Sequence, residues 1–399
     1  MRLPHLLRTF FFGFIFGVFA LCATAQTWMQ TSTLTRALSI ASSADGARLV
    51  LAANSGSIYT STNFGSIWTP TSAPELWWSS VASSADGTVL LAAAGDKVFV
   101  SQDAGTSWTP STPTNFCLWS SVAISALGDV LVAASGGWPL YTNAIYVSSN
   151  SGATWARSGA PPETWLSVAT SSDGSRLAAT FADVPNGAVY ISTNYGLNWS
   201  SNYVSSDVFD AQIAIASSAS GMTLLTLAQS GSAFQSQDGG TTWSNVLALS
   251  YVQSGSVACS ADGITLAVVA CTGRSPTLAF VSTNSGANWS QTQLSLYTNR
   301  NSVASSADGT KLAAAVAGEG TYAWQRPPSP MLCLVLLGTE LQLSWTVPSI
   351  NFVLEQSAAV TTGDWKSPGV TPVLNYSNLQ YEVSIPKPDG NIFYRLVWR

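Results

Sequence analysis

Apolar and polar residues follow one another in short runs along most of the chain. Apolar stretches such as Leu90–Ala94 end at Ser, Asp, Asn or Gly, and no segment shows the 3.6-residue spacing of an amphipathic helix. Short runs of this kind are typical of strands separated by tight turns. The pattern therefore predicts an all-β fold and excludes helical solenoids.

A hairpin signal recurs seven times. It reads Ser-Ser-Ala-Asp-Gly at residues 42–46, and the copies end at glycines 41 to 47 residues apart: Gly46, Gly87, Gly128, Gly174, Gly221, Gly263 and Gly309. Asp-Gly is expected to supply the positive-φ positions that a tight hairpin turn requires. Strand-like residues flank each copy, so the signal predicts seven pairs of strands.

A second motif, Ser-x-(Asp/Asn)-x-Gly-x-x-Trp, occurs six times between the hairpins. Its third position is occupied by Asn63, Asp103, Asn150, Asn194, Asp238 and Asn284. We expect this side chain to accept N–H bonds within its own turn, the glycine to be left-handed, and the tryptophan to pack between neighbouring sheets. The motif resembles the Asp-box, or bacterial neuraminidase, repeat of the sialidase-like superfamily, in which the box is an element of the fold and not an active site.

Together the motifs give four strands in each unit of about 43 residues, which is typical of a propeller blade. Seven hairpins against six boxes leave the last unit one strand short, because its third strand ends near Gln325. Thr27–Ser32 resembles the residues around the box tryptophans, so the N-terminal strand is expected to complete the last sheet and remove an open edge. The prediction is a seven-bladed β-propeller over residues 26–325.

The two ends of the chain differ from the repeats. Residues 1–25 have the pattern of a secretory signal peptide, in which an apolar run of 12 residues, Phe10–Leu21, precedes a possible cleavage site after Ala25. The run is too short to span a bilayer as a helix. We expect a secreted protein, whether periplasmic, cell-surface or extracellular, with no transmembrane segment after cleavage.

The C-terminal end follows a Pro-rich linker, residues 326–330. Residues 331–399 contain four strand-like runs, and they predict a small β-sandwich. This segment resembles the fibronectin-III-like modules that end many secreted bacterial proteins, which usually tether, sort or space.

Composition excludes several classes of function. The chain has 15 Lys and Arg against 20 Asp and Glu, with no clustered basic surface, so no nucleic-acid partner is expected. The single histidine, His5, lies in the leader. The mature chain therefore lacks a Ser-His-Asp or Cys-His nucleophile system and a His-ligated zinc site, and we expect no metal and no cofactor.

Four cysteines remain outside the leader. No CxxC pair suggests a metal site among Cys117, Cys259, Cys271 and Cys333. The strand pattern does not place Cys259 opposite Cys271. We expect mostly buried free thiols, with one disulfide bridge still allowed.

A candidate ligand surface lies where the fourth-to-first strand connections meet. Counting nine residues back from each hairpin glycine places Trp78, Trp119 and Trp165 at the start of three consecutive innermost strands. Trp77 adjoins them, and the loop 135–144 adds Trp138 and Tyr141. Aromatic planes of this kind suit sugar rings or an extended peptide, but they also fill space between blade ends.

Charged residues accompany this surface. Glu75 and Glu163 precede two of the tryptophans in matching connections and can accept hydrogen bonds from ligand hydroxyls, or they are ordinary solvated loop charges. On the predicted blade count only Arg274 and Arg300 fall on the same face.

Two sets of aspartates are candidates for chemistry. Asp183, Asp207 and Asp210 lie in loops on the ligand face, and a pair of carboxylates is what glycoside hydrolysis uses, although loops are also where Asp commonly occurs. The hairpin aspartates could ring the opposite opening and attract a cation, but turn chemistry alone explains them: Asp45, Asp86, Asp173, Asp262 and Asp308.

The resemblance covers the boxes and does not extend to a sialidase site. Sialidases of this kind use three arginines, one in a Phe/Tyr-Arg-Ile-Pro motif, with a Tyr nucleophile, and the chain has no such motif. Xyloglucan hydrolases carry the boxes on two propellers, whereas the single-propeller photosystem II assembly-factor-like proteins and the sortilin-type receptors carry them for binding. The expected function is non-catalytic binding of a glycan or peptide by an exported monomer. The alternatives are a glycoside hydrolase that uses loop carboxylates and no histidine, and a surface spacer without a ligand.

Overall fold

The computed structural model describes residues 28–113, 117–137, 143–182, 188–204, 211–272, 276–295, 300–325, 332–337, 339–346, 352–358, 364–375, 380–388 and 392–398. Within these ranges the regular structure is all strand, as predicted, and no helix of membrane-spanning length and apolarity occurs. The chain divides into two compact units, with the boundary between Pro327 and Pro328.

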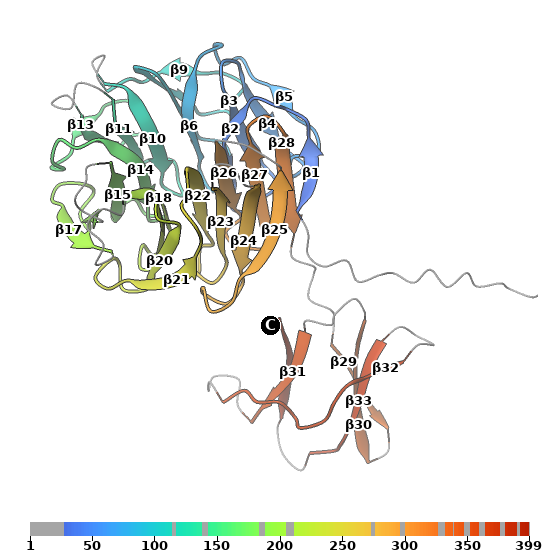
Figure 1. Cartoon of the computed structure of the whole chain (residues 1–399). Helices are drawn as coiled ribbons and strands as arrows, with labels where there is room; N and C mark the ends of the chain where they lie inside the picture. Colours follow the sequence, from blue (N-terminus) through green and yellow to red (C-terminus); the bar gives the residue numbers. More distant parts are fainter. Residues whose placement is uncertain are drawn as a thin grey trace, which may run out of the picture. The chain divides into compact units, whose positions relative to one another are not determined.

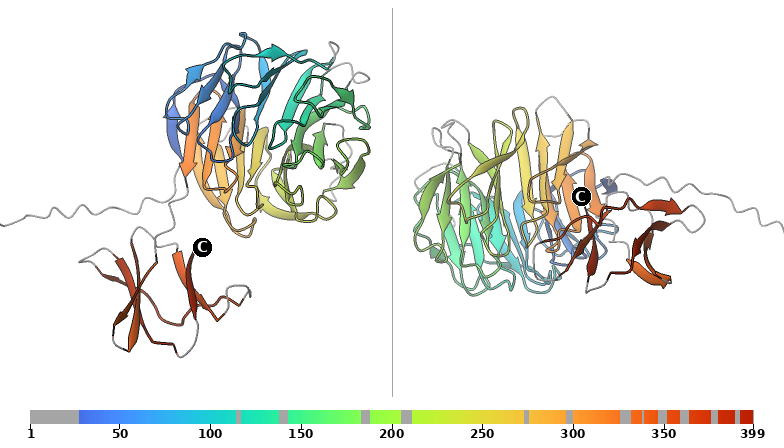
Figure 2. Two further views of the ribbon diagram at one scale, coloured as in Figure 1. Left: turned by 180° about the vertical axis from the view of Figure 1, so that it is seen from behind. Right: turned by 90° about the horizontal axis from the view of Figure 1, so that it is seen from below.

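Four-stranded antiparallel sheets repeat along the first unit (Figure 1). The first sheet contains β2 (Ala37–Ser42), β3 (Leu49–Ala53), β4 (Ile58–Ser61) and β5 (Thr69–Pro70). Five further sheets repeat this order: β6 (Trp78–Ser83) to β9 (Thr109–Pro110), β10 (Trp119–Ile124) to β13 (Ala156–Arg157), β14 (Trp165–Thr170) to β17 (Ser200–Tyr203), β18 (Gln212–Ser217) to β21 (Ser244–Ala248), and β22 (Ser254–Cys259) to β25 (Ser290–Ser295). The sheets follow one another around a common centre in the views of Figures 1 and 2.

The seventh sheet of the described residues joins the two ends of this unit. It contains β26 (Asn301–Ser305), β27 (Lys311–Val316) and β28 (Gly320–Gln325), and its outer strand is β1 (Met29–Ser32). Met29 lies opposite Ala323 in the register, and the hydroxyls of Thr31 and Thr321 are 3.0 Å apart. β1 thus forms a ladder with β28, and Trp28 packs with the core of this sheet.

The hairpin turns differ from the predicted geometry in one respect. Gly46 is left-handed, with φ of 71°, but Asp45 is not, so Asp-Gly does not supply two positive-φ positions. The Gly46 N–H donates to the Ser43 carbonyl at 3.0 Å, and Asp45 instead caps the turn by accepting the Ser43 hydroxyl at 2.6 Å and the Ala47 N–H at 2.9 Å. The turn is longer than a two-residue hairpin loop, and its aspartate acts as an acceptor.

Backbone hydrogen bonds join the hairpin turns of neighbouring sheets. In each turn one N–H donates to a carbonyl of the next turn, and the series returns from the last turn to the first. The bonds measure 2.7 to 3.0 Å and run Ala44 to Ala85, Ala85 to Ala126, Ala126 to Ser172, Ser172 to Ala219, Ala219 to Ala261, Ala261 to Ala307, and Ala307 to Ala44. We call this set the turn ring. It ties the same end of all seven sheets together.

The six box turns share one geometry. Asn63 Oδ1 accepts the Ser61 hydroxyl and the Ile67 N–H, each at 2.9 Å, and the side chain at the equivalent position does the same in every copy. The box glycine is left-handed, and so is the residue before it, for example Phe64 with φ of 56°. The box tryptophans are partly buried against the cores, as Trp155 is.

The carboxylates of the hairpin turns and of the box turns predict a loss of stability in acid. The hydroxyl of Ser84 and the N–H of Thr88 lower the pKa of Asp86 from 3.8 to about 2, and Thr242 lowers the pKa of Asp238 to about 2. Because the folded-state pKa lies below the unfolded one, the stabilisation is complete above pH of about 4 and is lost as the pH falls towards 2. We expect the melting temperature to fall over this window, and less steeply in an Asp86→Asn, Asp238→Asn double variant.

Differential scanning calorimetry at several pH values checks this expectation. Glu75→Gln, a change outside the turns, is the control and should leave the slope as it is. An identical slope in the double variant and the wild type would show that the turn carboxylates do not carry the acid sensitivity.

Cys259, Cys271 and Cys333 are free thiols. Cys271 lies opposite Ser254 and Cys259 opposite Leu266, so the two thiols are not paired across the hairpin, as expected. Burial raises the pKa of the Cys259 thiol to about 12. Cys117 and Cys271 are buried, and Cys333 is exposed.

The second unit is also built of strands. One sheet has the order β29 (Cys333–Leu337), β30 (Glu340–Thr346), β33 (Gln380–Pro386), β32 (Val373–Asn375), and β31 (Phe352–Ser357) pairs with β34 (Phe393–Trp398). Trp345 and Leu354 lie in its core. Arg395 pairs with the Glu355 carboxylate at 2.9 Å and lies over the Trp365 ring. The predicted linker at residues 326–330 lies outside the described residues.

Candidate functional site

The innermost strands of the seven sheets carry a repeated serine. We number each innermost strand from the residue nine positions before its hairpin glycine, which is the first position. The serine occupies the third position. Its hydroxyl oxygen accepts a hydrogen bond from the backbone N–H at the fourth position of the next innermost strand, at 3.1 to 3.2 Å. The serines that do so are Ser39, Ser80, Ser121, Ser167, Ser256 and Ser302. Ala214 occupies the position in β18. These serines link neighbouring sheets around the axis.

The first five innermost strands differ from the last two. In β2, β6, β10, β14 and β18 the register shifts between the first and third residues, whereas β22 and β26 pair without a shift. A bulge redirects the side chains around it. The start of β22 and β26 therefore presents its residues differently from the other five strands.

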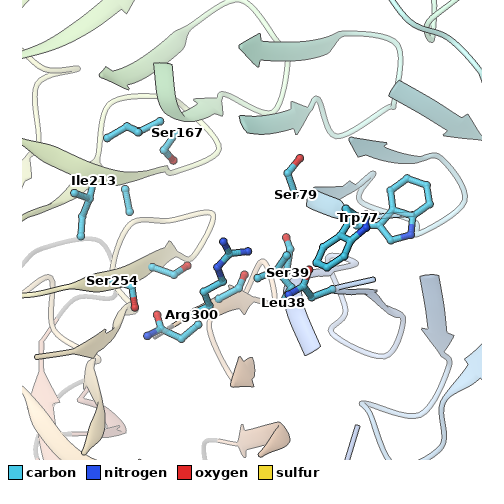
Figure 3. Close-up of a pocket in the computed structure, with 16 residues that line it drawn as sticks. Leu38, Ser39, Trp77, Ser79, Ser167, Ile213, Ser254 and Arg300 are labelled. Atoms are coloured by element: carbon cyan, nitrogen blue, oxygen red, sulfur yellow. The ribbon is translucent and has the colours of Figure 1, made fainter. Parts of the chain in front are cut away.

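A cavity of about 620 Å³ opens at this end of the innermost strands (Figure 3). Its described lining divides into two walls. The bulged strands give a wall whose apolar residues are Leu38, Leu166 and Ile213, with Trp77 beside it, and we call it the apolar wall. It also carries three serines: Ser39, Ser79 and Ser167. The unshifted strands give a polar wall: Ser254, Gly255, Ser256, Arg300, Asn301 and Ser302. We call this space the axial cavity.

The polar groups of the axial cavity are serine hydroxyls, the amides of Asn54 and Asn301, and one guanidinium. Arg300 is exposed, is the charged residue of the described lining, and extends towards the middle of the space in Figure 3. Within the described residues no carboxylate lies within ion-pair distance of it. The hydroxyls of Ser39, Ser167, Ser256 and Ser302 each use their oxygen as an acceptor and keep the O–H for donation. The cavity thus offers donors and one positive charge.

The predicted tryptophan platform is wrong for three of its members. Trp78 and Trp119 are 2% exposed and Trp165 is fully buried, so none presents a ring face to a ligand, although Trp78 contributes to the lining of the axial cavity. In the bulged strands the first position points between sheets: Trp78 packs among residues of the first and second sheets and donates its indole N–H to the Gly56 carbonyl at 2.8 Å. Only Trp77, 70% exposed, remains of the four described tryptophans on this surface.

The other predicted site residues fall in different places. Arg300 lines the axial cavity. Glu75 lines a separate hollow of about 360 Å³ together with Arg36 and Tyr59. Glu163 is half-buried, and its charge adds to the burial that raises the pKa of Tyr190. The remaining candidates lie outside the described residues: Trp138, Tyr141, Asp183, Asp207, Asp210 and Arg274.

The hairpin aspartates are bound within their own turns. Asp262 accepts the Ser260 hydroxyl and the Ile264 N–H, as Asp45 does in the first turn. In the described part of the chain no group of three His, Cys, Asp or Glu side chains is placed to hold a metal ion. Turn capping therefore accounts for these carboxylates.

Sequence reasoning missed the serines at the third position and the apolar wall. A signal for the serines was present, because serine recurs two residues after the first position in six of the seven innermost strands. The apolar wall had no such signal, since its residues occupy the second position, where Ser79 and Gly255 also occur.

Comparison with known proteins gives a fold and no family. No protein-family model matches the chain, and no curated protein matches its sequence. Among solved structures, a GH74 enzyme of Niastella koreensis matches with a TM-score of 0.58 and 15% identity over 80% of this chain and 59% of that one. An ancestral GH74 enzyme matches with a TM-score of 0.54 and 14% identity over 81% and 54%. The chain therefore spans less than two thirds of these enzymes.

A second kind of protein matches over nearly its whole length. YCF48 from Cyanidioschyzon merolae has a TM-score of 0.55 and 13% identity, over 75% of this chain and 99% of its own. A structure of YCF48 bound to D1 peptide gives the same TM-score and identity, with 96% of that chain covered. At such identities the likeness concerns the fold alone, which is that of a β-propeller.

Proposed function

We propose that residues 26–325 form a closed seven-bladed β-propeller that binds a peptide or glycan in the axial cavity without catalysis. The observation that carries this proposal is the composition of the cavity. Its described lining combines an apolar wall, an exposed tryptophan and several donors, and it contains no carboxylate. Ligand sites commonly pair apolar walls with a few convergent polar groups. A glycosidase needs two carboxylates across the scissile bond.

The likeness to both GH74 enzymes and YCF48 leaves binding and hydrolysis as distinct hypotheses. One matched structure contains a peptide, so peptides are the first ligand class to test. Hydrolysis would rely on Asp183, Asp207 or Asp210, which lie outside the described residues. Release of sugar from a polysaccharide by the mature chain would contradict the proposed non-catalytic role.

We also propose that the protein is exported and monomeric, that its six box turns are Asp-boxes, and that its C-terminal unit is a fibronectin-III-like sandwich. The leader pattern supports export. The shared hydrogen bonds of the six boxes support the second assignment. The third rests on the two sets of paired strands in that unit.

A peptide and glycan array with the mature chain tests the binding role. Ile213→Trp, which fills the axial cavity, is expected to weaken the hits at least about tenfold, as the loss of about 1.4 kcal/mol would. Leu197→Trp, at an exposed residue of a box turn, is the matched control and should leave the hits unchanged. Hits that survive Ile213→Trp would place the binding surface elsewhere.

A further inference from the structure

The axial cavity has an unequal distribution of charge and apolar surface, and this limits the chemistry of its ligand. The argument rests on the binding function proposed above. One wall is formed by the bulged strands and is apolar at Leu38, Leu166 and Ile213. The other is formed by the unshifted strands and carries Arg300.

The polar wall departs from the sequence repeat at two positions. The first position holds Ala, Trp, Gln or Ser in the other six repeats and Arg300 in the last, and Gly255 replaces the larger second residue of its counterparts. A Cβ atom at Gly255 would lie 2.2 Å from Leu227 Cδ2, so a side chain there would have to displace Leu227 behind the strand.

Several polar groups of the cavity can bond a ligand, including the Asn301 amide, whose Nδ2 and Oδ1 both have no hydrogen-bond partner among the described residues. Arg300 has five N–H donors and no acceptor, and the four lining serines of the third position retain their O–H groups. No lining carboxylate competes for the guanidinium within the described residues. A ligand carboxylate matches Arg300 and the serine hydroxyls, because it supplies acceptor oxygens and a negative charge in the planar geometry that arginine prefers.

We propose that the axial cavity binds a carboxylate attached to an apolar body. The carboxylate is held by Arg300 and the serine hydroxyls, and the apolar body lies against Leu38, Leu166 and Ile213, with Trp77 at the side. Two sources have this chemistry: the C-terminal residue of a peptide with an apolar side chain, and a small apolar carboxylic acid.

Two matched tetrapeptide libraries distinguish the sources, one with a free C-terminal carboxylate and one with a C-terminal amide. Binding to the full mature chain is measured by affinity selection, and octanoate and phenylpropionate are titrated separately by calorimetry. Peptides that end in an apolar residue are expected to bind at least about tenfold more tightly as acids than as amides, because a hydrogen bond to a charged group contributes more than a neutral one. Binding by the small acids alone would support the carboxylate site and identify that source.

Arg300→Gln is expected to abolish the difference between acid and amide. Arg36→Gln, in the neighbouring hollow, should preserve it. A second measurement does not depend on the variant: added salt should weaken binding of the acids and leave the amides unchanged.

Three results would overturn the carboxylate site. The first is equal binding of the acid and amide libraries that Ile213→Trp blocks. This result would keep the proposed binding function but exclude a carboxylate as the group that the cavity recognises. The absence of binding by both the acid library and the small acids would also contradict it. Array hits limited to neutral glycans would support binding in the cavity while excluding the carboxylate.

Discussion

Deletion of residues 26–33 is expected to lower the melting temperature of the mature chain by at least about 10 °C. The deletion removes β1 from the β1–β28 ladder and takes away Trp28, which is buried with Trp324 in the same core. Loss of a buried tryptophan alone costs about 3–5 kcal/mol, and each kcal/mol shifts the midpoint by about 2–4 °C in a domain of a few hundred residues. Removal of the ladder hydrogen bonds also exposes an edge at β28.

Met29→Ala is the control for this deletion, because Met29 is 69% exposed on the same strand. We expect it to change the free energy of unfolding by no more than about 0.5 kcal/mol. Circular dichroism or calorimetry measures both variants. A deletion variant that melts with the wild type would show that the last sheet does not need the N-terminal strand.

The second large effect is expected for Trp165→Ala, at about 3–5 kcal/mol of lost stability. Trp165 has no exposed surface and packs edge-on against Tyr190, with ring centroids 5.4 Å apart, and against Phe181 at 6.0 Å. A cavity left by the indole cannot be filled without moving both rings. Chemical denaturation followed by tyrosine and tryptophan fluorescence measures the change.

Trp77→Ala is the matched comparison, because Trp77 was predicted for the same surface and is largely exposed. We expect its unfolding midpoint to stay within about 0.5 kcal/mol of wild type, with its effect confined to ligand binding. If Trp165→Ala kept full stability while ligand binding was lost, Trp165 would be a ligand-contacting residue and its placement in the core would be wrong.

The repeat could be predicted from the sequence because its turns require particular residues. A Cβ atom at Gly174 would lie 2.5 Å from Val130 Cβ, and the backbone there is left-handed, so a glycine must recur at each hairpin. The box turns need an acceptor side chain to hold their own backbone. Such local requirements appear in the sequence at fixed offsets, and the order of the strands follows from them.

The exposure of the tryptophans could not be predicted in the same way. Trp77 and Trp78 are adjacent in the chain, yet one is 70% and the other 2% exposed. The difference in exposure depends on the preceding sheet, which covers the side chain of Trp78 at the first strand position. It does not cover Trp77, the residue before the strand. Sequence periodicity locates the strand but does not show what lies against it.

The lining of the axial cavity was partly predictable. Arg300 was placed on this face by the repeat count. The serines were not predicted, because a serine in a strand fits the usual alternation of polar and apolar residues. The N–H groups bonded to Ser39 and Ser167 lie 42 and 48 residues away in the sequence. The two walls depend on register shifts, which no local residue pattern marks.

Amide hydrogen exchange at the turn ring tests whether the seven sheets close on themselves. The donors sit in turns at the surface, where an unbonded N–H exchanges quickly, so protection there requires the bond to the next sheet. We expect Ala307, which donates to Ala44 at 2.8 Å, to be protected as strongly as Ala44, Ala85 and the other donors of the ring. Fast exchange at Ala307 with protection of the remaining six amides would show an open seam between the last sheet and the first, and would contradict the closed propeller.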